Sequence, residues 1–151
     1  MLGHLGFSYI GLIYLLMLFI PNIIWIKNKP VNYDSTIENK TLILLERLGQ
    51  ISSASIILIF NDFNIDYFSI WTFWLIISFL LMILYEIAWF KYFKSEHKIE
   101  NFYNEFYKIP VPLATLPVLA FLLLGVYGKV IWLILSAIIL GIGHIGIHIN
   151  I

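Results

Sequence analysis

The sequence predicts an all-α fold, specifically a polytopic bundle of five transmembrane helices. Its composition is the first reason: the 151 residues are 61% hydrophobic and only 12% charged, values typical of membrane proteins rather than soluble domains. Apolar runs close to the roughly 20 residues that cross a bilayer recur along the chain. Lysines and tryptophans lie between these runs or near their ends. We expect one integral membrane domain over residues 1–151.

Five apolar runs predict the five helices, at roughly 4–26, 41–60, 69–92, 110–127 and 130–150. The first, fourth and fifth carry no formal charge, and the third is interrupted only by Glu86 and Lys91. The second is the weakest, because Glu46, Arg47 and several polar residues dilute it. We retain it because, without it, the two lysine-rich connections would lie on opposite sides of the membrane.

The lysines predict the orientation of the bundle. With the N-terminus outside and the C-terminus in the cytoplasm, seven of the eight lysines fall on the cytoplasmic side, as the positive-inside rule requires. The tryptophans fall near predicted span ends, where interfacial belts collect them. We expect a multi-pass protein of the plasma membrane, with the lipid bilayer as its main partner.

The connection between the third and fourth spans has its own pattern. Apolar and aromatic residues recur there at helical spacing, and charged or amide residues occupy the other face: the apolar set is Ile99, Phe102, Tyr103, Phe106 and Tyr107. This pattern predicts a cytoplasmic amphipathic helix near 96–108 that lies in the interfacial plane. It is expected to act either as a connector that caps the bundle or as a lid over a pocket.

Other features exclude whole classes of function. The chain has no cysteine, which excludes disulfides, thiol catalysis and iron–sulfur ligation. Its net charge is zero, so we expect no nucleic-acid partner. No nucleophile elbow, glycine-rich phosphate loop or HExxH motif is present, so no reaction class can be named from motifs.

Polar residues within the predicted spans gather near one membrane face. At 1.5 Å per residue, Glu46, Glu86, His144 and His148 lie within about 10 Å of the inner boundary. Ionisable groups at this depth are costly and indicate a functional site. We predict a ligand or ion pocket there, formed by Asn22, Glu46, Arg47, Gln50, Glu86, His144 and His148.

One chemistry for this set is a metal site. His144 and His148 are one helical turn apart, a standard arrangement for two ligands of one ion. Glu46 and Glu86 at matching depth would complete a site for zinc, iron or manganese.

Three functions compete for the same pocket. The first is binding or transport of a small ligand or ion, in which a membrane carboxylate beside a histidine exchanges a proton, and a homodimer supplies the rest of the path. The second is a membrane-embedded enzyme, metal-dependent or not, acting on a lipid or another amphiphile, with histidine as general base and Arg47 as anion clamp. The third is a non-catalytic interaction subunit or scaffold, in which the same residues form structural pairs. We favour the first.

Overall fold

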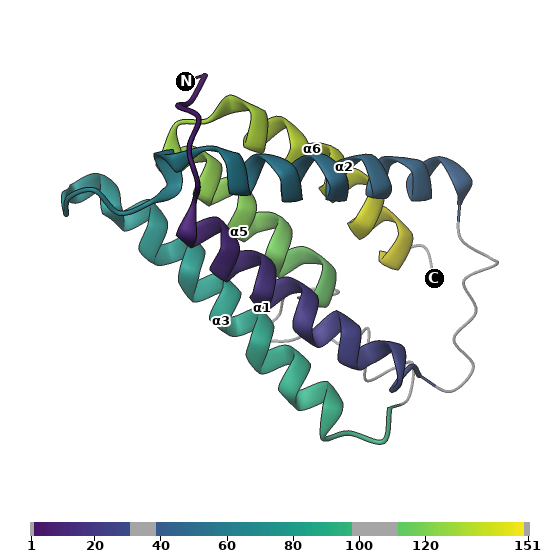
Figure 1. Ribbon diagram of the computed structural model, residues 1–151. Helices are drawn as coiled ribbons and strands as arrows, with labels where there is room; N and C mark the ends of the chain where they lie inside the picture. Colours follow the sequence, from purple (N-terminus) through teal and green to yellow (C-terminus); the bar gives the residue numbers. More distant parts are fainter. Residues whose placement is uncertain (1, 31–38, 98–111, 150–151) are drawn as a thin grey trace.

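The computed structural model describes residues 2–30, 39–97 and 112–149, apart from the side chain of His148. Within these ranges it has five α-helices and no β-strand, which confirms the predicted all-α class (Figure 1). The helices are α1 (Tyr9–Ile26), α2 (Lys40–Ile59), α3 (Phe73–Phe93), α5 (Pro112–Gly128) and α6 (Ile131–Ile149). Two short 3₁₀ turns, η2 (Asn61–Phe63) and η3 (Ile70–Thr72), join α2 to α3.

The predicted helix limits hold within a few residues except at the start of α1. That helix begins at Tyr9 rather than near residue 4, because Ser8 caps it: its hydroxyl accepts a hydrogen bond from the Gly11 backbone N–H at 2.8 Å. The predicted amphipathic helix near 96–108 lies almost entirely outside the described residues, which stop at His97 and resume at Pro112.

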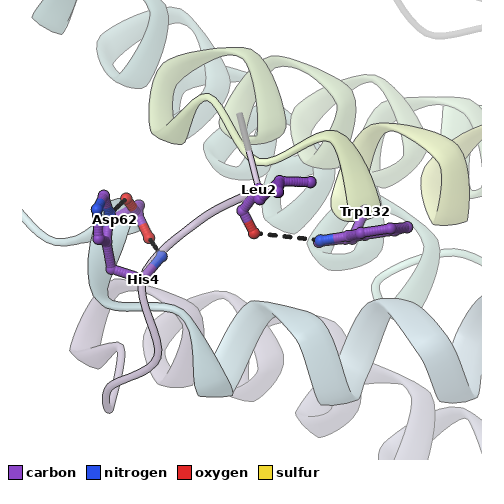
Figure 2. Close-up of polar contacts among 4 residues, drawn as sticks. All are labelled: Leu2, His4, Asp62 and Trp132. Carbon is purple, nitrogen blue, oxygen red and sulfur yellow. Dashed lines mark hydrogen bonds and ion pairs between the residues drawn. The ribbon is translucent and has the colours of Figure 1, made fainter.

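The residues before α1 form an extended strap across one end of the bundle (Figure 2). His4 donates its backbone N–H and its ring Nδ1–H to the Asp62 carboxylate, at 2.5 and 2.7 Å. The Trp132 indole donates to the Leu2 carbonyl at 3.1 Å. These bonds satisfy backbone groups that a helix would have paired internally, so the strap does not need helical structure.

Three neighbouring pairs of helices hold the bundle together: α2 with α6, α6 with α5, and α5 with α3. The α2–α6 pair is the closest, and Gly143 on α6 explains why. A Cβ atom at Gly143 would lie 2.3 Å from the Glu46 backbone nitrogen on α2, so only glycine allows this approach. Small residues at such crossings are a recurrent feature of membrane helix pairs.

Helix α1 packs against the rest in a different way. The N-terminal end of α1 packs closely against α2, since a Cβ at Gly11 would lie 1.9 Å from the Ile57 carbonyl oxygen. Further along, α1 and α2 diverge (Figure 1). Hydrogen bonds to α3 then hold α1: Tyr14 pairs with Ser78 at 2.8 Å, and the Asn22 amide donates to the Tyr85 hydroxyl at 2.9 Å.

The outer surface of the bundle is strongly apolar. Helix α1, helix α2 and the continuous segment Ile70–Phe93 are long and apolar enough to cross a membrane. The apolar stretches Pro112–Gly128 and Ile131–Ile147 are shorter. Large hydrophobic side chains are exposed on several helices, among them Leu16 and Ile23 on α1, Ile87 on α3 and Ile142 on α6. Apolar surface of this extent indicates a membrane protein.

Candidate functional site

A cavity of about 250 Å³ lies where α1 separates from α2. All five helices contribute to its walls, and most of the lining is aliphatic or aromatic. The polar lining residues are Asn22 on α1, Gln50 and Ser53 on α2, Tyr85 on α3 and His144 on α6. An apolar cavity with a few convergent polar groups has the composition of a small-molecule binding site.

The shortest polar contact at the cavity joins α6 to α2. The His144 ring nitrogen Nδ1 lies 2.5 Å from Glu46 Oε1, and both side chains are about one-fifth exposed. An ionised carboxylate can only accept hydrogen bonds, so Nδ1 carries the hydrogen in this contact. Gln50, one turn further along α2, donates to the same carboxylate oxygen at 3.5 Å. Glu46 therefore lies behind the cavity wall and orients two of its polar groups.

The close helix crossing explains why this contact forms. Gly143 brings the α6 backbone against α2 at Glu46, and His144 is the next residue along α6. The absence of a side chain at residue 143 therefore determines where the imidazole meets the carboxylate. Backbone packing and side-chain pairing at this point depend on the same glycine.

Ser53 presents a hydroxyl that has no partner in the described part of the chain. It is 1% exposed, lines the cavity, and its Oγ makes no hydrogen bond. Its neighbours behave differently: Ser52 and Ser55 donate to the carbonyls of Leu48 and Ile51 at 2.7 and 2.8 Å. Serine in a helix usually makes this backbone bond. The exception at Ser53 leaves a buried hydroxyl without a hydrogen-bond partner at the cavity wall.

Asn22 and Tyr85 form the opposite polar wall. The Asn22 amide donates both to the Leu18 carbonyl, at 2.6 Å, and to the Tyr85 hydroxyl, at 2.9 Å. These bonds use the nitrogen of Asn22 and leave its carbonyl oxygen directed away from them. The wall thus adds hydrogen-bonding groups to the cavity without adding a formal charge.

The structure brings together part of the predicted residue set and separates the rest. Asn22, Gln50 and His144 line the cavity, and Glu46 supports it. Arg47 is exposed on α2 and is not among the lining residues. The side chain of His148 lies outside the described set.

Glu86 is the clearest departure from the predicted pocket. It lies in a different groove, between α1 and α3, and does not line the cavity. Each residue of an α-helix turns the side-chain direction by about 100°. When α3 directs Tyr85 into the cavity, Glu86 must point elsewhere.

Because Glu86 lies away from Glu46 and His144, it is not positioned to share a metal ion with them. Among the residues that the structure describes, no group of three or more histidine, aspartate or glutamate side chains could hold a metal ion. Of the four predicted ligands, His144 and Glu46 are in contact, Glu86 lies in another groove, and the side chain of His148 lies outside the described set.

Sequence reasoning missed two of the polar groups at the cavity, Tyr85 and Ser53. Tyr85 shares a helix face with Ser78, Met82 and Trp89, all of which are buried. That pattern was visible in the sequence and could have identified Tyr85. The unpaired state of the Ser53 hydroxyl leaves no trace in the sequence.

No protein-family model matches this chain, and no curated protein or solved structure is significantly similar to it. The cavity offers hydrogen bonds from an amide pair, two hydroxyls and a carboxylate-bound imidazole, all within an apolar enclosure.

Proposed function

We propose that this chain is a multi-pass membrane protein that binds a small, uncharged amphiphilic molecule in the cavity between α1 and the other helices. The buried Ser53 hydroxyl is the observation that carries the proposal, because a buried polar group without a partner is costly and calls for an explanation. A ligand hydroxyl, carbonyl or amide would satisfy it.

The size and lining of the cavity support a ligand of this class. A volume of about 250 Å³ corresponds to a molecule of about ten non-hydrogen atoms. The Glu46–His144 contact is already satisfied internally, so the wall presents no unpaired ion to attract a charged ligand. The aliphatic lining, including Leu15, Val118 and Leu140, would bury the apolar body.

We further propose that all five helices cross the membrane, with the N-terminus outside and the C-terminus in the cytoplasm. The alternation of helix directions supports this proposal, since residues 2–8, the η2–η3 connection and the α5–α6 turn gather at one end of the bundle (Figure 1). At the other end, Lys27 and Lys29 follow α1, Lys40 begins α2 and Lys94 follows α3. Asn22, Tyr85 and His144 then lie within about 12 Å of the cytoplasmic boundary, and Ser53 lies deeper, about 20 Å along α2 from Lys40.

A thiol introduced into the cavity tests ligand binding directly. The chain has no cysteine, so Ser53→Cys supplies the only thiol. We expect it to react slowly with methyl methanethiosulfonate. Uncharged amphiphiles of about ten non-hydrogen atoms, such as octanamide, octanol and indole, should slow the reaction further, by at least threefold for one of them.

The matched control is Ser55→Cys, on an exposed face of the same helix. Its reaction should be fast and insensitive to the same compounds. The proposal fails if none of the compounds protects residue 53, or if residues 53 and 55 are protected equally, since equal protection reports partition into the detergent or bilayer rather than occupancy of the cavity.

A further inference from the structure

A second carboxylate, Glu86, lies apart from the cavity just described. It belongs to an open groove of about 460 Å³ between α1 and α3. The α1 side of the groove is formed by Ile20, Pro21 and Ile24, and the α3 side carries Glu86 among apolar and aromatic residues. Glu86 is the only ionisable residue among the groove-lining residues that the structure describes.

Glu86 has no partner that explains its position. Its Oε1 atom is buried, and within the described ranges the carboxylate makes neither a hydrogen bond nor an ion pair. Lys91 and Lys94, the lysines that follow it on the same helix, are exposed. An unpaired carboxylate at this depth is expensive, and residues of this kind mark functional sites in membrane proteins.

The walls around Glu86 favour a cation with apolar surroundings. Aromatic side chains of Trp89, Phe90 and Phe93 line the same groove. The protein's own Lys94 ammonium already lies 4.4 Å from the centroid of the Phe90 ring. Aromatic faces attract cations, and the attraction increases where water is excluded. A carboxylate and aromatic rings in one groove therefore match a positively charged organic molecule.

Depth and charge identify the source of that cation. Glu86 lies about 10 Å before the end of α3 at Phe93, below the level expected for lipid headgroups. A phospholipid headgroup would also bring a phosphate, which the carboxylate would repel. We infer that the α1–α3 groove binds a membrane-soluble organic cation, with its charge paired to Glu86 and its apolar body against Ile20, Ile24 and Phe90.

Equilibrium dialysis of the full chain in a neutral detergent tests this inference, with tetraphenylphosphonium as the probe. We expect saturable binding that weakens at least tenfold in Glu86→Gln, because the substitution keeps the shape and removes the charge. Phe90→Leu, at a residue that is 60% exposed, should weaken binding about threefold through loss of the aromatic face. The neutral analogue triphenylphosphine oxide should not distinguish the wild type from Glu86→Gln.

Asp66→Asn is the matched control, since it converts an exposed carboxylate outside both sites to an amide, and it should leave binding of the probe unchanged. The thermal unfolding midpoint of Glu86→Gln should equal or exceed that of the wild type, because a partly buried charge is removed; this separates lost binding from lost folding. Unchanged binding in Glu86→Gln would overturn the inference. So would saturable displacement of the probe by phosphatidylcholine, which would assign the groove to a phospholipid.

Discussion

At the scale of single residues, the Glu46–His144 contact is a polar link between α2 and α6. A hydrogen bond between helices in a membrane contributes about 0.6–1.7 kcal/mol. We expect Glu46→Gln and His144→Ala each to lower the free energy of unfolding. The double variant should lose less than the sum of the two, giving a coupling energy of about 1 kcal/mol in a double-mutant cycle. Unfolding in mixed detergent, followed by circular dichroism, would measure it.

Arg47 provides the control for this cycle. It is adjacent to Glu46 but exposed on another face of α2. The cycle with Arg47→Gln and His144→Ala should therefore be additive within about 0.5 kcal/mol. Additivity in the Glu46 cycle as well would show that the contact contributes nothing to stability.

Residues of the candidate site also show where sequence reasoning stops. Depth along a helix follows from counting residues, so Asn22, Glu46 and His144 could be placed in one layer in advance. The direction in which a side chain points depends on how its helix packs. Tyr85 and Glu86 are adjacent on α3, yet Tyr85 lines the cavity and Glu86 does not. The sequence favoured the glutamate because charge at membrane depth is conspicuous.

At the scale of helices, the α2–α6 crossing depends on Gly143. We expect Gly143→Ala to destabilise the bundle by about 1–3 kcal/mol, because the new methyl group would lie 2.3 Å from backbone that cannot move locally. The same substitution should separate His144 from Glu46. Detergent unfolding would give the loss of stability, and hydrogen exchange of α2 peptides would report the separation.

Gly146→Ala is the matched control on the same helix. Its added methyl group would lie 3.1 Å from a flexible leucine terminus, Leu42 Cδ2, which can shift. We expect an effect below about 1 kcal/mol. Equal losses from the two substitutions would mean that helix propensity, rather than the crossing, determines the outcome.

Helices were the part of the fold that the sequence predicted best. Length and apolar composition identify each of them, and their ends follow charges, prolines and glycines. The predicted first helix began too early, because residues 4–8 continue the apolar run of the sequence. Their extended conformation depends on hydrogen bonds to Asp62, Ile59 and Leu58, which are distant in sequence and invisible to local patterns.

At the scale of the whole molecule, the proposed topology makes a separate prediction. Tyr67→Cys, in the η2–η3 connection, should react in intact cells with a maleimide that cannot cross membranes. Lys27→Cys, at the end of α1, should react only after permeabilisation. The absence of native cysteine makes each thiol unique. Reaction of both residues from the same side would contradict the proposed crossing of the membrane by α2, the helix that separates them.

The sequence by itself determined that the chain is helical and apolar, how its helices are divided, and which polar residues share a depth. These properties follow from composition and from spacing along one chain. Only the tertiary structure decided that α1 diverges from α2 to leave a cavity, that Ser53 and Tyr85 line it, and that Glu86 lies in a separate groove. The physical reason is that packing between helices sets the rotation of each helix about its own axis and its distance from its neighbours. The close backbone approaches at Gly11 and Gly143 fix the rotation and the distance at two crossings, and each crossing depends on side chains from more than one helix. The histidine and glutamate that the sequence placed at one depth thus form a contact, while the second glutamate at that depth belongs to another surface.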